Sequence, residues 1–205
     1  MSLCQRHTNS LLQDIPGMEN LSLIDQINGI EEDKVHSTVR DCFNRLWRNE
    51  IDTFPKADSF KQFKDSINFE RYLEDIKVRK HRVSLAKLRL SDHCLMIEKG
   101  RYYRPPILRE ERWCPHCPLV VENEEHFVTE CPAYNRVAIF TQISDIAPQF
   151  AQLNSHDKFI YLMSQEDRGT LQEFAKQVHK WLMSRLDFED QQKEIDNILS
   201  TIEIQ

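Results

Sequence analysis

The stretch CPHCPLVVENEEHFVTEC, residues 114–131, places three thiols and one imidazole close together in an otherwise helical-looking chain. Cys114 and Cys117 form a C-x2-C pair, which sets two thiolates on one edge of a metal ion from a single turn. His126 and Cys131 follow as an H-x4-C pair, after a gap long enough for the chain to turn and reverse. We therefore predict that these four side chains bind Zn²⁺. Four protein ligands leave no open coordination position, so the predicted zinc is structural rather than catalytic.

The alternative interpretation of this stretch is three buried thiols and a surface histidine. His116 lies between the first two cysteines and could compete as a ligand, but its place inside the turn favours outward projection. The other cysteines, at positions 4, 42 and 94, have no partner at ligand spacing, and Cys42 fits the core face of a helix. In an intracellular protein such cysteines are more often thiols or metal ligands than disulfides.

The sequence around the cysteines is typical of a helical protein. It has only 4 Gly, and its apolar residues recur mostly at helical spacing. This periodicity predicts helices over about 32–48, 58–65, 69–77, 80–92, 155–163 and 168–186, and another that begins at Pro132. The segment from Cys94 to Ile107 is expected to hold a short extended piece and a turn at Gly100. The predicted fold is mainly α, a helical domain with an inserted small CCHC zinc knuckle.

The same reading divides the chain into five parts. Residues 1–31 are an irregular lead-in, 32–92 a helical region with a basic last helix, and 93–133 a basic connection with the zinc knuckle. Residues 134–186 are C-terminal helices, and 187–205 an acidic tail that either forms a final helix or frays. No run approaches the roughly 18 apolar residues that a membrane span needs, and the start has no apolar stretch of signal-peptide length. We therefore expect an intracellular protein, nuclear or cytoplasmic, without membrane contact.

Positive charge is concentrated in one window. The chain has a net charge of -6, but Lys77–Arg112 holds 11 Lys and Arg against 4 Asp and Glu, leaving -13 for the other residues. Aromatic residues interleave with the arginines there, as in proteins that bind single strands by stacking and phosphate contacts. The opposing interpretation is a solvated basic helix face with aromatic residues packed on the knuckle. The predicted nucleic-acid contacts are Lys80, Arg82, Lys87, Arg89, Arg101, Tyr102, Tyr103, Arg104, Arg109, Arg112 and Trp113.

Residues 35–145 resemble the segment that follows the reverse-transcriptase domain in LINE-type, non-LTR retrotransposon proteins. That family shows an R-x-x-L-x-x-L-R helix, a serine–histidine pair, a G-R-aromatic turn, an arginine just before C-x2-C, and E-x-E-H-F-x-x-x-C-P. The matching residues are Arg82 to Arg89, Ser91 to His93, Gly100 to Tyr102, Arg112, Cys114 to Cys117, and Glu122 to Pro132. The upstream FNRLWRNEI (43–51) and FKQFKDSINFERYL (60–73) also resemble its helical lead-in.

The resemblance implies a zinc-knuckle domain that engages RNA or DNA, with Cys114, Cys117, His126 and Cys131 as ligands. The chain departs from the family in having no Asp-Asp dipeptide and no nuclease motif after Cys131. Asp75-Ile76-Lys77 has the acidic-x-Lys form of a nuclease, but that pattern is common in charged helices. Ser91, Asp92 and His93 lie too close in sequence to form a triad unaided. We therefore predict a protein that is not an enzyme.

Two functions remain open from the sequence. The first is a non-catalytic, zinc-binding, nucleic-acid-binding module, derived from a non-LTR retrotransposon protein, that uses the basic segment beside the knuckle. The second is a zinc-stapled helical module for protein–protein interaction without nucleic-acid binding, in which the basic window docks onto acidic protein surface, such as the chain's own acidic tail. A protein partner could also bind through that acidic tail. The choice between RNA and DNA and the oligomeric state are left open.

Overall fold

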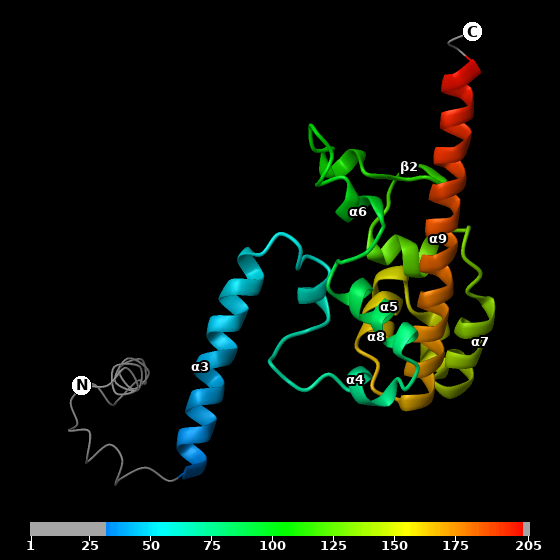
Figure 1. Ribbon diagram of the computed structural model, residues 1–205. Helices are drawn as coiled ribbons and strands as arrows, with labels where there is room; N and C mark the ends of the chain where they lie inside the picture. Colours follow the sequence, from blue (N-terminus) through cyan, green and yellow to red (C-terminus); the bar gives the residue numbers. More distant parts are fainter. Residues whose placement is uncertain (1–31, 203–205) are drawn as a thin grey trace. The chain divides into compact units, whose positions relative to one another are not determined.

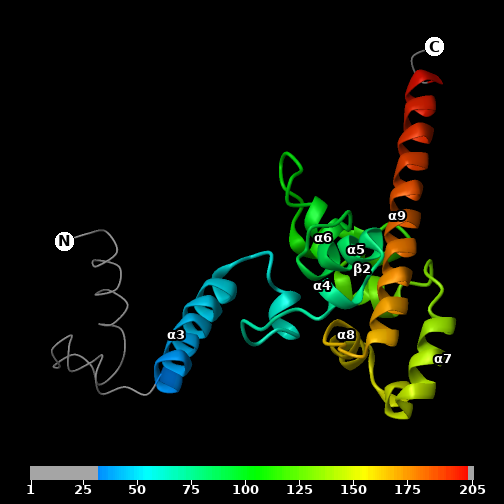
Figure 2. The same ribbon diagram turned by 60° about the horizontal axis from the view of Figure 1, so that its bottom comes forward.

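The computed structural model describes residues 32–202, and the side chains of residues 37–197. The predicted lead-in, with Cys4, lies outside the described residues. Two units make up the described chain: residues 32–54 with 65–68, and residues 55–64 with 69–202. Figures 1 and 2 show the elements of both units. No helix in the described range is long and apolar enough to cross a membrane.

The first unit is built on α3 (Glu32–Thr53), which confirms the helix predicted from residue 32 and extends it by several residues. Two hydrogen bonds hold the segment 65–68 against this helix. Arg48 Nε donates to the carbonyl of Asp65 at 2.7 Å, and the amide of Ile67 donates to Asn44 Oδ1 at 2.8 Å. Cys42, predicted to be a core residue, is only partly buried.

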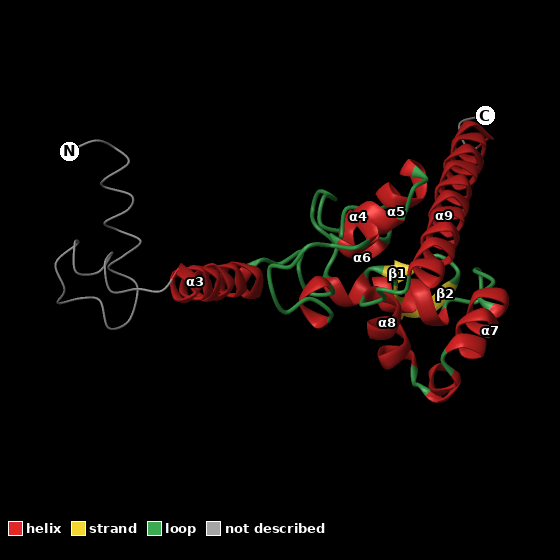
Figure 3. Ribbon diagram, turned by 90° about the horizontal axis from the view of Figure 1, so that it is seen from below, coloured by secondary structure: helices red, strands yellow, loops and turns green. Residues whose placement is uncertain are grey.

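The second unit is mainly helical, which confirms the predicted fold class. Its elements in chain order are η1 (Phe60–Gln62), α4 (Tyr72–Asp75), α5 (Arg79–Arg89), α6 (Met96–Lys99), η2 (Arg109–Glu111), β1 (Trp113–Cys114), β2 (Cys117–Val121), η3 (His126–Glu130), α7 (Val137–Ile146), η4 (Pro148–Gln152), α8 (Ser155–Met163) and α9 (Arg168–Ile202). The two strands form the only sheet in the described residues, and Figure 3 shows them beside α9.

The core of this unit forms around α9. Leu171, Phe174, Ala175, Val178 and Leu182 recur on one helix face and are all buried. Helices α4, α5 and α7 pack against α9, and α8 packs against η3. The three thiols of residues 114–131 belong to this same core cluster. The stretch that carries the predicted ligands is therefore packed into the helical core.

Several local predictions were wrong in detail. The helix expected over 58–65 is the single turn η1, and that expected over 69–77 is only α4. The piece expected to be extended after Cys94 contains α6. The helix expected at Pro132 begins at Val137, because the segment before it is occupied by the exit from the cysteine stretch. The last helix does not end at 186: α9 continues through the predicted acidic tail to Ile202.

Candidate metal centre

The first two predicted ligands lie on a hairpin. Strand β1 pairs antiparallel with β2, and Cys114 lies opposite Cys117. Pro115 and His116 make the turn between them. Directly opposed residues of a ladder project their side chains on the same face, so the C-x2-C spacing brings both sulfurs to one side of the hairpin.

The second pair is set by an unusual helical turn. Residues 126–130 form a π-helix, and the amide of Cys131 donates to the carbonyl of His126 at 2.8 Å, five residues back. In a regular α-helix, residues five apart lie on different faces, whereas the wider π turn brings them closer to the same side. Such bulges occur frequently at functional sites. The H-x4-C spacing therefore works here because the helix is locally widened.

The four side chains converge. Their ligand atoms all lie within 4.8 Å of one another, and all four residues are buried. The Sγ of Cys131 lies 3.7 Å from that of Cys114 and 3.8 Å from that of Cys117. Two sulfurs bound at about 2.3 Å to one tetrahedral zinc would lie about 3.8 Å apart. The same distances are far too long for a disulfide. The cluster of Cys114, Cys117, His126 and Cys131, called the Cys/His cluster below, could hold a metal ion.

The imidazole of His126 supports this interpretation. Its Nε2 is buried and has no hydrogen-bond partner in the protein. Its Nδ1 lies 3.3 Å from Oε2 of Glu130. Histidines that bind metals usually engage a carboxylate through their other ring nitrogen, and buried polar atoms without a partner are rare. Because His126 is buried, the alternative with a surface histidine at this position is wrong.

The thiols are poorly suited to ionise without a cation. Burial, helped by the neighbouring thiols of Cys114 and Cys117, raises the pKa of Cys131 to about 12. Burial also raises the pKa of Cys114, against which the backbone amide of His116 acts by hydrogen bonding to the sulfur. A bound divalent ion reverses this preference, since coordinating thiols are deprotonated outright. The donor set of three sulfurs and one nitrogen suits Zn²⁺.

His116 is not part of the cluster. Its ring centroid lies 4.4 Å from that of Phe188 on α9 and 6.0 Å from that of Tyr134. The side chain is partly buried. The prediction that His116 is not a ligand agrees with this geometry, but the prediction that it projects outward was wrong, because α9 covers it.

A buried ion pair ties the hairpin to α9. Glu122 directly follows β2, and its carboxylate accepts from Nε and from one terminal nitrogen of Arg185 at 2.7 and 3.2 Å. The side chains of Glu122 and Arg185 are 1% and 4% exposed. Glu122 Oε2 also accepts from the amide of Met96 at 2.7 Å, at the start of α6. One carboxylate thus joins the hairpin, α6 and α9.

A second buried carboxylate, that of Glu124, joins the helix containing His126 to the end of α5. It accepts from Ser91 Oγ at 2.6 Å and from Ser59 Oγ at 2.7 Å, and lies 3.0 Å from Nε2 of His93. Burial acts to raise the pKa of Glu124, but these hydrogen bonds and the charge of His93 outweigh it and lower the pKa to about 2. Ser91 and His93 therefore position Glu124, two residues before the candidate ligand His126.

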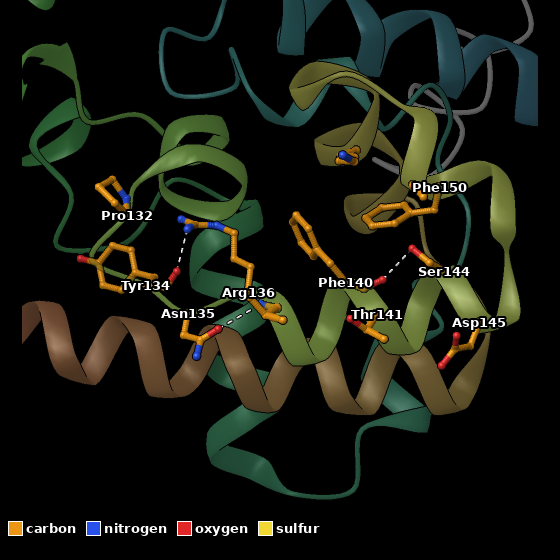
Figure 4. A pocket seen from close by; sticks show the side chains of 12 residues that line it. Pro132, Tyr134, Asn135, Arg136, Phe140, Thr141, Ser144, Asp145 and Phe150 are labelled. Carbon is orange, nitrogen blue, oxygen red and sulfur yellow. Dashed lines mark hydrogen bonds between the residues drawn. The ribbon is translucent and has the colours of Figure 1, made fainter.

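Arg136 caps the C-terminal end of the π-helix. Its guanidinium donates to the carbonyls of Phe127, Val128, Cys131 and Tyr134 at 2.5 to 2.7 Å. Figure 4 shows the contact between Arg136 and the carbonyl of Tyr134, in a pocket whose lining includes residues 132–136 and residues of α7. The last carbonyls of a helix have no partner within it. Arg136 satisfies them and so fixes the turn that carries His126 and Cys131.

Two residues predicted to contact nucleic acid are buried. Arg89 is 6% exposed, donates to the carbonyl of Met163 and pairs with Glu70 at 2.8 Å. Arg112 is 8% exposed and donates to the carbonyls of Ile97 and Ile107 at 2.8 and 3.0 Å. The predictions that Arg89 and Arg112 contact phosphates were wrong, because their guanidinium groups donate to carbonyls inside the protein. The arginine that precedes C-x2-C therefore has a structural role.

The remaining predicted contacts fall into two groups. Lys80, Lys87, Arg104, Tyr103 and Trp113 are exposed. The side chains of the other group form contacts within the chain. Arg101 pairs with Glu98 at 2.9 Å, and Arg109 pairs with Asp58 at 2.7 Å. Arg82 donates to the carbonyl of Ile76, and Tyr102 donates to Glu98; Tyr102 and Arg109 are nevertheless exposed. The structure brings the predicted residues to two places, the exposed face of α5 and the loop between α6 and β1.

Sequence reasoning missed the residues that support the cluster. The glutamates of ENEEH (122–126) were visible, but the pattern did not indicate that Glu122 and Glu124 would be buried with separate partners. Arg185 lies 63 residues after its partner Glu122 and falls between Ser184 and Leu186 of a helix. Arg136 stands beside a predicted helix start and had no apolar or charge pattern to mark it. Only the tertiary contacts reveal these roles.

Compared with protein-family models, with curated proteins and with solved structures, this chain has no match. Its function is therefore argued from the geometry of the site.

Proposed function

We propose that this chain is a zinc-stapled, non-catalytic module that binds single-stranded nucleic acid through the basic surface beside the Cys/His cluster. The observation that carries the proposal is the convergence of four buried ligand atoms within 4.8 Å, with Nε2 of His126 lacking any protein partner. Binding a structural Zn²⁺ contributes to folding directly. The zinc would order the hairpin, the π-helix and the basic loop that leads into them.

The first part of the proposed nucleic-acid surface is the exposed face of α5. Lys77, Arg79, Lys80 and Lys87 are all exposed. Three of these residues stand at or just before the N-terminal turn of α5, where the helix dipole disfavours cations by about 0.3–1 kcal/mol each. These three cations therefore lower the stability of α5. Contact with phosphates gives a reason for their position at this end of the helix.

The second part is the loop between α6 and β1. Tyr102, Tyr103 and Trp113 are 64%, 47% and 47% exposed, and Arg104 is exposed between them. Exposed aromatic rings beside a cation offer stacking surfaces for unpaired bases.

The resemblance to non-LTR retrotransposon proteins supports the same proposal. Its motif residues interact with one another here: Ser91 and His93 hold Glu124, and the side chain of Arg112 lies against Gly100. Residues of motifs that lie apart in the sequence are therefore in contact in the fold. We propose that the chain derives from the region after the polymerase in such a protein and acts inside the cell, in the nucleus or cytoplasm.

A protein–protein interaction module is the second candidate. The observation that favours it is that Arg101, Arg109 and Lys99 already pair with carboxylates of this chain, at Glu98, Asp58 and Glu189. A basic loop that accepts internal carboxylates could also accept those of a partner. The salt-dependence experiment below separates the two candidates.

Metal content is the first test. Purified protein analysed by mass spectrometry is expected to contain one zinc per chain, and a strong chelator is expected to remove it together with cooperative melting. The variant Cys117→Ser should lose the metal. Cys94→Ser is the matched control, because Cys94 lies outside the cluster. A fully folded, metal-free wild-type chain would reject the site.

Nucleic-acid binding is the second test. Affinity for single-stranded RNA and DNA should fall steeply as salt rises from about 50 to about 200 mM. The double variant Lys80→Glu with Lys87→Glu should weaken binding and reduce the salt slope by about 2, one for each lost phosphate contact. Replacing Arg40 by Glu on α3 controls for a change in charge outside this surface. Absence of any association at the lower salt would favour the protein-interaction candidate.

A further inference from the structure

Two histidines meet where α5 packs against α9. The ring centroids of His81 and His179 lie 5.3 Å apart, and Ser84 Oγ lies 2.9 Å from Nδ1 of His179. Both rings are partly exposed, whereas Ser84 is buried, and the two helices lie side by side in Figures 1 and 2. The two rings therefore form a pair on a fixed scaffold that remains open to solvent.

The charges around this pair are mainly positive. Lys80 and Lys180 are exposed, and Lys176 is half-buried with its Nζ 3.0 Å from Glu173. Lys80 and Lys176 act on the ring of His81, opposed by Glu173, and Lys80 also acts on His179. Helix α4, which also packs against α9, carries Asp75, and Arg71 pairs with that carboxylate at 3.6 Å. We call Lys80, His81, Lys176, His179 and Lys180 the histidine seam.

This environment differs from that of three other histidines in the described chain. His93, His126 and His156 each lie within 3.3 Å of a glutamate oxygen. The seam histidines face each other and lysines instead. Burial lowers the pKa of His81 and of His179, and the neighbouring cations lower them further. Among the described residues, ion pairs between a histidine and a carboxylate involve His93, His126 and His156 but neither seam ring, so no close anion stabilises the charged form of either ring.

We infer that the histidine seam is a proton-linked phosphate-binding surface, where both rings take up protons when a nucleic-acid strand binds. The inference rests on the proposed function and extends its surface from α5 onto α9. A phosphate placed beside the lysines supplies the negative charge that the histidines lack. Because an anion favours the charged form of imidazole, binding raises the histidine pKa values and consumes protons.

The direction of the pH dependence follows from this linkage. In the free protein the neighbouring cations disfavour the charged rings, whereas the phosphate in the complex favours them. Affinity for the strand therefore rises as pH falls toward and below the ordinary histidine pKa of about 6.5. A rise of one unit in the pKa of one ring changes the affinity by at most tenfold, so the two rings together give about tenfold when each pKa rises by about half a unit.

The test compares binding of a single-stranded oligonucleotide, as RNA and as DNA, between about pH 6 and about pH 8 at constant ionic strength. The wild-type chain with its zinc retained is expected to bind about tenfold more tightly at the lower pH. His81→Asn and His179→Asn should each reduce this ratio, and Lys180→Glu should weaken binding throughout. His156→Asn on α8 is the matched control and should leave the ratio unchanged.

A measurement on the wild-type protein tests the same inference if a variant fails to fold. The imidazole protons of His81 and His179, followed by nuclear magnetic resonance, should titrate at higher pH once the oligonucleotide is added. Binding that depends on salt but not on these two histidines would overturn the inference and leave the proposed function standing. No binding at any pH would overturn both.

Discussion

The guanidinium of Arg185 on α9 lies against the carboxylate of Glu122, with Nε 2.7 Å from Oε1 and both side chains buried. Removing one partner of a buried ion pair leaves an uncompensated charge. We expect Glu122→Ala or Arg185→Ala to lower the free energy of unfolding by about 3–5 kcal/mol. Urea denaturation measures the change.

The control for this pair is its joint replacement by apolar residues. Glu122→Met with Arg185→Met should be less destabilising than either single alanine variant, because no lone charge remains buried. A double variant as unstable as the sum of the singles would show that the two side chains do not interact. The metal content of each variant should be measured alongside, since Glu122 lies at the end of the hairpin that carries two ligands.

The cluster predicts an asymmetric response to ligand replacement. His126→Cys retains four zinc donors, whereas His126→Ala retains three. We expect His126→Ala to lose much more zinc affinity than His126→Cys. The melting temperature of the alanine variant should approach that of the wild-type protein treated with chelator. Thermal melts with and without chelator measure both. Equal melting temperatures for the wild-type protein in the two conditions would contradict a structural metal.

Substitutions at Ser91 separate the effect of its left-handed backbone conformation from that of its hydrogen bond to Glu124. It has φ of 51° at the end of α5, and its Oγ donates to Glu124 at 2.6 Å. Ser91→Ala loses the hydrogen bond and keeps the left-handed backbone, whereas Ser91→Gly loses the bond but relieves about 1 kcal/mol of strain. Glycine should therefore be the more stable of the two in denaturant unfolding. A more stable alanine variant would mean that the backbone does not hold this conformation in solution.

Gly100 is expected to resist even alanine. A Cβ atom added there would lie 2.7 Å from Cγ of Arg112, whose guanidinium is fixed by two carbonyls. The side chain cannot move away without breaking those hydrogen bonds, so Gly100→Ala should cost about 1–3 kcal/mol. Gly169→Ala is the control, because its added Cβ would meet nothing closer than 3.5 Å. Equal stability of the two variants in urea would contradict the close approach.

The helical class and the four predicted ligands followed from the sequence because both are local patterns. Apolar spacing repeats within a few residues, as in the face of α9 from Leu171 to Leu182, and C-x2-C fixes two thiols within one turn. Short elements such as η1 and α4 were mispredicted, since tertiary packing rather than propensity decides where a single turn ends.

By itself, the sequence determined that the chain is mainly helical and which three thiols and imidazole belong together. Only the tertiary structure decided which charges are free. Arg89 and Arg112 look like their exposed neighbours in sequence, but each meets buried carbonyls contributed by distant or folded-back segments. The same is true of Glu122 and Arg185, and of the ring pair His81 and His179. The physical reason is that burial and charge pairing depend on segments far apart in the chain, which no local pattern encodes.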